Sequence, residues 1–492
     1  MIVASSIRFP QVRATGWQDD VREVGLALIR EQVPVALRYK NSASAEFRDA
    51  AASENKALPV HRWVPWIAGY SGPFVQDAIA AYLPSRGRDS QVVLDPFAGV
   101  GTTLVEALMS GRNAVGYELN AFAALAARAK VACVDVSPAS FESAIDSFRA
   151  AMVRFERTID RRWSEGGEAA LRSNLKKLSR LRPERFRSRI PLFSPPVEAK
   201  FLFAVGQTSS VPADLRALFQ VALGATMISF SNYTYEPSLS SRPGAGKALI
   251  ENASVALPVC GKLDVMLDDV TSVIEQYGAV WSPRRREVVG ASYFGSTLPP
   301  RSVSLLVTSP PYMNNYHYVR NTRPQLHWLG LIEDQDQLRG YEDASFGKFW
   351  QTVRQRRSVE LECDLPSLAA NIEQLRALHL ERGPYGGSGW ANYVATYFND
   401  CERFLHIARR QLKAGGRAVI VVGNSIIQGI EFRVDELLAE LAERLGFTIE
   451  NIHIVRNKRV GNSIIDSSVR NGTGNGHRQK TQLYDAAVIL RH

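Results

Sequence analysis

The sequence predicts an α/β protein with a doubly wound, mostly parallel sheet of seven strands and a largely helical insertion. Two observations lead to this fold class. Short apolar runs alternate with stretches of helical periodicity near both ends of the chain, and strands in such an alternation pair in parallel between layers of helices. The last two apolar runs, 448–456 and 483–492, follow each other without an intervening helix, which predicts an antiparallel hairpin strand.

The alternation starts at residue 92 and is interrupted twice. The expected strands are 92–94, 113–118, 286–294, 302–308, 417–425, 448–456 and 483–492, with helices at 102–111, 393–413 and 434–446 between them. On this pattern the chain divides into an N-terminal helical preface (1–60), the first part of the sheet core (61–130), a helical insertion (131–285), a second part of the core with one strand and its loop (286–318), an irregular insertion (319–390) and the C-terminal half of the core (391–492).

The composition indicates a globular protein with a polyanionic partner. Hydrophobic residues make up 45% and charged residues 22% of the 492 residues, which is ordinary for a globular chain. The net charge of +10 favours binding to a phosphate backbone, because Lys and Arg release condensed counterions from it. The alternative is a merely basic enzyme. Because no apolar run is long enough to span a membrane and no signal peptide is apparent, we expect a cytoplasmic protein that binds no membrane.

The four cysteines are scattered along the chain, and no two of them have the spacing of metal ligands. This distribution makes a disulfide framework or a zinc site improbable. We therefore expect no metal.

A glycine-rich turn occupies residues 95–103, between an apolar strand and a helix. Gly99 and Gly101 allow a tight turn and a close approach of the backbone to a ligand. The turn lacks the Gly-Lys-Ser/Thr of a phosphate-binding loop and the third glycine of a dinucleotide site. Glu118, at the end of the next strand, can accept hydrogen bonds from ribose hydroxyls. The turn predicts a nucleoside-bearing ligand; the alternative is a simple strand-to-helix turn beside a solvated Glu.

A second motif follows the apolar strand 305–308 and reads Ser309, Pro310, Pro311, Tyr312. The two prolines fix the backbone and remove two N–H donors. The Ser309 hydroxyl and the Pro310 carbonyl can both accept hydrogen bonds from an amino group, and Tyr312 can stack on a planar ring. The alternative is an ordinary Pro-Pro turn. We interpret the second copy at 193–197 as an ordinary proline-bounded linker, since it follows no long apolar strand and precedes no aromatic residue.

Together the two motifs resemble the amino-methyltransferases of DNA modification systems, which carry a DPF-x-G-x-GTT loop and a [Ser/Asp/Asn]-Pro-Pro-[Tyr/Phe] loop. The resemblance implies the methyltransferase variant of this fold, S-adenosyl-L-methionine as cofactor and methylation of an exocyclic amino group on a flipped DNA base. Ser at the first position favours N4 of cytosine over N6 of adenine. The implied catalytic residues are Ser309, Pro310, Pro311 and Tyr312, and the implied cofactor-binding residues are Asp95, Phe97, Ala98, Gly99, Gly101, Thr102, Thr103, Glu118, Asn120 and Tyr70.

Two features depart from the family pattern. Family members often carry an Asp in the turn after the strand that precedes the catalytic strand, whereas this chain has 289–292, Val-Gly-Ala-Ser. Ser292 could take its place, or the adenine contacts come from elsewhere. The long insertion also falls earlier than is usual.

Phe74 is a further candidate for covering the methionine moiety, and a core position is an equal alternative.

Double-stranded DNA is the implied partner, and a cognate restriction endonuclease is a second one. The basic stretch 154–189, interleaved with Trp163 and Phe186, is a candidate for phosphate contacts, and a solvated helix face is its alternative. Residues 314–318 are candidates for contacts with the flipped base or its neighbours. Lys458, Arg459 and Arg470 lie in a Gly- and Asn-rich stretch that we expect to be a mobile loop and that could clamp the backbone.

Three other functions remain open at this point. An RNA methyltransferase acting on guanine in tRNA can share the Pro-Pro-Tyr loop, but such enzymes usually have Asp before the prolines. A catalytically inactive DNA-binding subunit would not need both motifs intact. Methyltransferases that act on protein glutamine favour Asn at the position of Ser309. No cysteine follows a proline as in the cytosine carbon-5 enzymes, which disfavours thiolate attack on a base.

Overall fold

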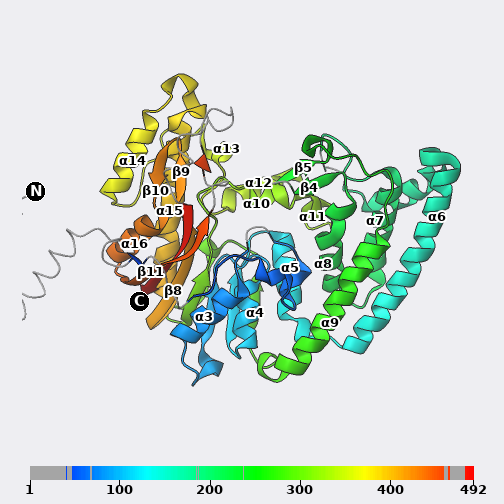
Figure 1. Cartoon of the computed structure of the whole chain (residues 1–492), viewed down its shortest axis with the longest axis horizontal. Helices are drawn as coiled ribbons and strands as arrows, with labels where there is room; N and C mark the ends of the chain where they lie inside the picture. The colour runs from blue at the N-terminus through cyan, green and yellow to red at the C-terminus, as the bar shows by residue number, and fades with distance from the viewer. Residues whose placement is uncertain are drawn as a thin grey trace, which may run out of the picture.

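The computed structural model describes residues 40–41, 47–66, 69–183, 186, 188–235, 238–458, 464–465 and 483–492. A mixed sheet in the order β1-β11-β13-β8-β7-β2-β3-β6 forms the centre of the molecule (Figure 1). β13 is antiparallel to both of its neighbours, β8 and β11, and the pairs β8–β7, β7–β2, β2–β3 and β3–β6 are parallel. The predicted fold class and its antiparallel hairpin strand are confirmed.

The strands of this sheet are β1 (Lys40–Asn41), β2 (Val92–Asp95), β3 (Asn113–Tyr117), β6 (Arg286–Val289), β7 (Val303–Thr308), β8 (Leu412–Gly423), β11 (Thr448–Lys458) and β13 (Leu483–Arg491). Two small sheets contain β4 (Tyr233–Tyr235) with β5 (Leu239–Ser241), and β9 (Ser425–Ile427) with β10 (Ile430–Phe432) and β12 (Ile464–Ile465). The two-residue strand β1 is too short for a sequence pattern to reveal, and it adds an eighth strand beside β11. Residues 1–39 and 42–46 of the predicted N-terminal helical preface lie outside the described residues.

Helices cover both faces of the central sheet because successive strand residues point to opposite sides. In β7, Leu305 and Val307 pack with the side of α3 (Gly72–Tyr82), α4 (Thr102–Met109) and α5 (Ala121–Val131), whereas Leu306 packs with the side of α15 (Gly387–Gln411) and α16 (Val434–Arg444). All three β7 residues are fully buried. Apolar runs without polar alternation therefore form central strands, as expected for a sheet that is covered twice.

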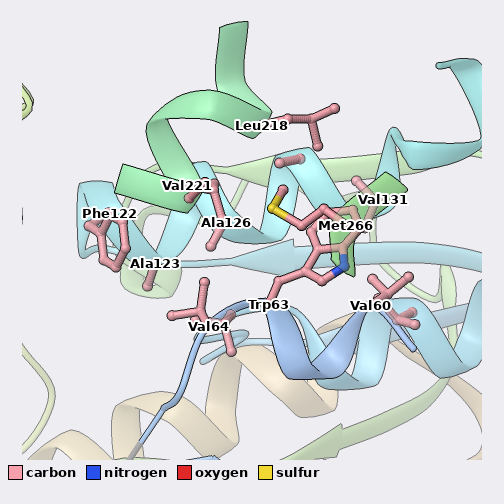
Figure 2. Close-up of a cluster of buried hydrophobic side chains, with 14 of the residues drawn as sticks. Val60, Trp63, Val64, Phe122, Ala123, Ala126, Val131, Leu218, Val221 and Met266 are labelled. Carbon is pink, nitrogen blue, oxygen red and sulfur yellow. The ribbon is translucent and has the colours of Figure 1, made fainter. Parts of the chain in front are cut away.

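The described stretch between α5 and β6 contains four α-helices, α6 (Pro138–Leu178), α7 (Pro195–Gln207), α8 (Arg216–Thr226) and α9 (Ala256–Trp281). α6 is interrupted at Gly166 and Gly167, whose backbone angles are not helical. Trp63, in the segment before α3, lies among side chains of α5, α8 and α9 (Figure 2). These helices share one hydrophobic cluster with α3, α4 and α5, so the stretch extends the core on that face of the sheet.

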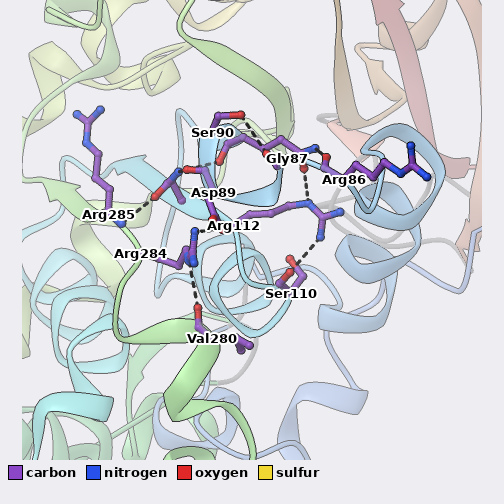
Figure 3. Close-up of polar contacts among 11 residues, drawn as sticks. Arg86, Gly87, Asp89, Ser90, Ser110, Arg112, Val280, Arg284 and Arg285 are labelled. Carbon is purple, nitrogen blue, oxygen red and sulfur yellow. Dashed lines mark hydrogen bonds and ion pairs between the residues drawn. The ribbon is translucent and has the colours of Figure 1, made fainter.

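The return from this helical stretch to the sheet is fixed by polar contacts at the amino ends of the strands (Figure 3). Arg284 pairs with Asp89, which precedes β2, and its Nε donates to the carbonyl of Val280 in α9 at 3.2 Å. Arg112 Nη1 donates to the carbonyl of Ser110 at 3.2 Å. The last turn of α9 and the turns that begin β2 and β3 are therefore joined side by side.

Residues 319–390 are not irregular, as the sequence suggested, but hold a series of helices. These are α10 (Tyr318–Asn321), α11 (Arg323–Trp328), α12 (Gln335–Ala344), α13 (Trp350–Val353) and α14 (Pro366–Arg376). Most of them span fewer than three turns, which is too short for a clear 3.6-residue apolar period, and Gly330 and Gly347 lie in the connections on either side of α12.

The second Ser-Pro-Pro sequence is the start of a helix rather than a linker. Ser194 occupies the N-cap of α7 and Pro195 the first helical position, where a missing N–H has no cost. In the part of the chain that the structure describes, none of the helices has the length and apolar character that a membrane crossing would require.

Candidate functional site

A cavity of about 320 Å³ lies at the edge of the sheet where β2, β3 and β7 end. Ligands of doubly wound sheets bind outside the carboxyl ends of the strands, so this edge is the expected place for a site. The sequence-predicted site residues that line the cavity are Tyr70, Phe97, Ala98, Gly99, Thr102, Glu118, Asn120, Ser309, Pro310, Pro311 and Tyr312. The glycine turn and the Ser-Pro-Pro-Tyr loop thus face one common space.

The glycine turn has the backbone geometry that its sequence requires. Gly99 and Gly101 have φ angles of +52° and +88°, which L-residues with a side chain rarely adopt. A Cβ on Gly101 would also lie 3.1 Å from the Cβ of Ala127 in α5. Gly101 therefore faces a neighbouring helix rather than the cavity, whereas Gly99 lines it.

The carboxylate of Glu118 closes the turn from the end of β3. Its Oε2 accepts from the N–H of Gly99 at 2.8 Å and its Oε1 from the N–H of Asn120 at 2.7 Å. Burial raises the pKa of Glu118 to about 7, and these two backbone donors oppose the rise. Each carboxylate oxygen keeps a further lone pair, so the group can still accept from ligand hydroxyls in the cavity.

Asn120 lines the cavity but mainly caps α5. Its Oδ1 accepts from the N–H groups of Phe122 and Ala123 at 3.1 and 3.2 Å, and its Nδ2 donates to Thr322 Oγ1 at 2.6 Å. Asn120 thereby connects the cofactor half of the site to the helices that follow the Ser-Pro-Pro-Tyr loop.

Asp95 lies beneath the cavity and does not line it. Its fully buried carboxylate accepts from the hydroxyls of Thr103 and Thr308, both at 2.6 Å, from the Tyr70 hydroxyl at 3.2 Å and from the N–H of Phe97 at 3.0 Å. Burial raises the pKa of Asp95, and its hydroxyl donors oppose the rise.

These contacts tie together the ends of β2 and β7, which carry the two motifs. The predicted cofactor residues Asp95, Gly101 and Thr103 are therefore placed behind the cavity wall, where desolvated hydrogen bonds fix its shape. Tyr70 has a double position, because its ring reaches the cavity while its hydroxyl points to Asp95. Phe74 is fully buried in the core and does not line the cavity.

The Ser-Pro-Pro-Tyr loop is held from three sides. The Tyr312 hydroxyl is hydrogen-bonded to Ser309, and the Tyr312 N–H donates to the hydroxyl of Tyr318. The next residue, Met313, is fully buried, and its carbonyl accepts from Ser425 Oγ at 2.6 Å. These contacts anchor the loop where it forms a wall of the cavity.

The segment 341–349, at and after the end of α12, forms a wall of the cavity that the sequence did not reveal. Phe346 packs edge-on against Phe97, and Ser292 Oγ donates to the carbonyl of Ala344 at 3.5 Å. Glu342 pairs with His317 at 3.1 Å. This wall lies next to Ser292, where the carboxylate expected in the family is absent. No local pattern marks the segment, because it reaches the site only through tertiary folding.

The aromatic residues of the basic stretch 154–189 do not form a stacking platform. Trp163 packs beside Leu171 within the α6–α7 pair, and the ring of Phe186 contacts His327 and Trp328. The cations of α6 that lie on its surface include Arg154, Arg157, Arg161, Arg172, Lys176 and Lys177. Of the late-loop cations that the sequence singled out, Lys458 is the last residue of β11, and Arg459 and Arg470 lie outside the described residues. The described residues hold no group of three or more potential metal ligands.

Comparisons with known proteins find a matching family model and several relatives. A family model described as DNA methylase matches residues 74–128, which hold α3, β2, the glycine turn, α4 and β3. The chain is 25% identical over 439 residues to the type II methyltransferase M.AvaI of Nostoc sp., covering 82% of each protein. It is 22% identical over 450 residues to the type II methyltransferase M.BsoBI of Geobacillus stearothermophilus, covering 83% of this chain and 82% of the relative.

The type II methyltransferase M.MjaII of Methanocaldococcus jannaschii is 31% identical over 88 residues, or 18% of this chain and 16% of the relative. No solved structure matches the chain. The sheet order, the two motifs on one cavity, the matching family model and these relatives lead to one conclusion: the chain is similar to the DNA amino-methyltransferases.

Proposed function

We propose that this protein transfers a methyl group from S-adenosyl-L-methionine to the exocyclic amino group of a flipped base in double-stranded DNA, with N4 of cytosine favoured over N6 of adenine. The observation that carries the proposal is that Gly99 and Glu118, on one side, and Ser309, on the other, line a single cavity. Methyl transfer needs the donor and the amino group in one space. If the nucleoside site and the amino-group site lay on separate surfaces of the protein, the proposal would fail.

The cofactor end of the cavity fits the chemistry of the donor. The Glu118 carboxylate is an acceptor for ribose hydroxyls, the turn at Gly99 exposes backbone to the ligand, and Phe97 with Phe346 supplies apolar ring surface. When bound, the sulfonium supplies an electrophilic methyl group. The segment 341–349 and Ser292 are the proposed substitutes for the missing carboxylate at the adenine end.

The target end of the cavity fits an aromatic amine. Its nitrogen lone pair is delocalised into the ring, so the protein must favour a tetrahedral nitrogen. Ser309 and the Pro310 carbonyl are the proposed acceptors for the amino hydrogens, and Tyr312 the proposed stacking partner of the base. Flipping costs a few kcal/mol, which stacking and edge contacts offset. Ser rather than Asp before the prolines supports cytosine.

Ionisation of Glu118 should make cofactor binding depend on pH. The hydrogen bonds to ribose need the carboxylate, and its pKa is about 7. As pH falls from 8 to 6 the ionised fraction drops roughly tenfold, so the dissociation constant for S-adenosyl-L-methionine is expected to rise by about that factor. Calorimetry measures it. The Glu118→Gln variant, which cannot ionise, should bind weakly with a flat profile, and an equally steep profile in that variant would assign the effect to another group.

The exposed cations on α6 are the proposed contacts with the DNA backbone. Each phosphate contact that is lost reduces the dependence of log K on log salt by about 0.9. The double change Arg157→Ala and Arg161→Ala is thus expected to lower this slope by about 2 and to leave cofactor affinity unchanged. Arg409→Ala with Arg410→Ala, on exposed residues before the amino end of β8, is the control of equal charge. An equal decrease of the salt slope in both variants would mean that net charge, and not contacts of α6 with phosphates, causes the effect.

The relatives' name, type II methyltransferase, supports a role in a restriction-modification system, with a restriction endonuclease of the same specificity as the proposed second partner. The decisive experiment expresses the chain in a host without DNA methylation and sequences the host DNA by a method that detects N4-methylcytosine and N6-methyladenine. We expect N4-methylcytosine at one short sequence. Detection of N6-methyladenine instead would change the proposed target base to adenine. Methylated guanine in tRNA, together with unmodified DNA, would overturn the proposed function.

A further inference from the structure

Asp485 brings a carboxylate to the target end of the cavity from a part of the chain far from either motif. It lies near the start of β13, is 3% exposed and lines the cavity together with Ser309 and Tyr312. Its neighbours across the sheet are Gly423 of β8 and Arg456 of β11. The antiparallel direction of β13 is essential here, because it puts the start of that strand beside the carboxyl ends of β7 and β8.

The surroundings of Asp485 are those of the Ser-Pro-Pro-Tyr loop. Asp485 and Tyr312 line the same cavity, and the pKa of the Tyr312 hydroxyl is raised by burial and also by the charge of Asp485. Arg456, on the paired strand, also lines the cavity. The backbone around Asp485 is fixed to β8, because the N–H of Asn424 donates to the carbonyl of Tyr484 at 3.3 Å and the N–H of Tyr484 to Asn424 Oδ1 at 2.9 Å.

The reaction needs a proton acceptor that the Ser-Pro-Pro-Tyr loop does not supply. An amino nitrogen that gains a methyl group becomes cationic and must lose a proton, and a serine hydroxyl is a poor base at neutral pH. Among the described residues lining the cavity, three have carboxylates: Glu118, Glu342 and Asp485. Glu118 binds the N–H groups of the glycine turn, and Glu342 pairs with His317. Asp485 is the carboxylate beside Tyr312.

We propose that Asp485 shares one of the two amino hydrogens with Ser309 and takes that proton when the methyl group is transferred. In this step the nitrogen–methyl bond forms as the methyl–sulfur bond breaks, and the electron pair of the broken bond stays on sulfur. One N–H bond of the cationic amine then breaks, its electrons neutralise the nitrogen, and the proton moves to the carboxylate and from there to water. The inference rests on the proposed function and assigns one of its catalytic residues.

The test compares Asp485→Asn with the wild-type protein on an unmethylated duplex that carries the target sequence. The amide keeps the size of the side chain but cannot take a proton. We expect the single-turnover rate to fall at least tenfold, with dissociation constants for DNA and for S-adenosyl-L-methionine within threefold of the wild type. Base flipping, measured by 2-aminopurine fluorescence at the target position, should be retained, and Asp485→Glu should recover part of the rate.

Asp435→Asn is the matched control. Asp435 is also a buried carboxylate next to β13, where its Oδ1 accepts from the Tyr484 hydroxyl at 3.3 Å, but it does not line the cavity. This variant should melt at a lower temperature and keep the single-turnover rate.

A wild-type rate in Asp485→Asn would overturn the inference and leave the proposed function intact. A rate loss that is accompanied by an equal loss of DNA affinity or of flipping would also overturn it, since Asp485 would then be a binding residue. A wild-type protein that methylates no DNA amino group would instead refute the proposed function itself.

Discussion

Replacing Ser309 by Ala is expected to lower the rate of methyl transfer at least a hundredfold, about 2.7 kcal/mol in the activation free energy. The hydroxyl lies on the cavity wall, bonded to Tyr312, and is the proposed acceptor for the target amino group. Because the cofactor side of the cavity is built by other residues, the dissociation constant of S-adenosyl-L-methionine should change by less than threefold. Single-turnover assays on duplex DNA and calorimetry measure the two quantities.

The second Ser-Pro-Pro sequence provides the control within the same chain. Ser194→Ala makes the same chemical change before two prolines, but at the N-cap of α7, where the side chain makes no capping hydrogen bond. Its rate should equal that of the wild type. If Ser309→Ala also retained full activity, Ser309 would have no part in the chemistry, and the carbonyl of Pro310 would have to bind the amino group without it.

Replacing Asp95 by Ala is expected to remove both stability and cofactor binding. The carboxylate is fully buried and accepts from Thr103, Thr308, Tyr70 and the N–H of Phe97, so its loss leaves several desolvated donors without their acceptor. The free energy of unfolding is expected to fall by about 3 kcal/mol, and the melting temperature by about 3 °C. Since these bonds join the ends of β2 and β7, affinity for S-adenosyl-L-methionine should fall more than tenfold.

Two variants make this prediction sharp. Asp95→Asn keeps one acceptor oxygen and the side-chain volume, so its melting temperature should lie between those of the wild type and Asp95→Ala. Asp89→Ala removes an exposed carboxylate that pairs with Arg284 at the opposite edge of the sheet, and it should change neither property by much. An Asp95→Ala protein with wild-type affinity for the cofactor would show that the two strand ends keep their positions without this carboxylate.

Local sequence was sufficient for the strands of the central sheet other than β1 and for both motifs. The strand that contains Leu305 to Val307 is a continuous apolar run because both of its faces are buried, and the glycine turn requires positive φ angles that Gly99 and Gly101 supply. The lining of the cavity by Glu118 and Ser309 followed from one rule, that ligands bind at the carboxyl ends of parallel strands.

Other parts of the site depend on contacts between distant residues, which a single sequence does not contain. Asp95 belongs to the glycine-turn motif, but the motif does not reveal that its carboxylate points into the core. There it accepts a hydrogen bond from Thr308, more than two hundred residues away in the sequence. Asp485 enters through the antiparallel strand, and the wall at 341–349 follows helices too short to have a period. In each case folding, not local pattern, puts the residue at the cavity.

The continuity of the apolar cluster across α5, α8 and α9 has a consequence for anyone who wishes to alter sequence specificity by exchanging parts between related enzymes. Trp281, at the end of α9, is fully buried and donates from its Nε1 to the carbonyl of Val131 at 3.0 Å, and Asp269 of the same helix accepts from the backbone of Val60. Excising the helical stretch would uncover these partners to solvent. A chimera must therefore inherit α5 and the segment before α3 from the same parent as α6 to α9, or it will aggregate instead of acquiring a new target.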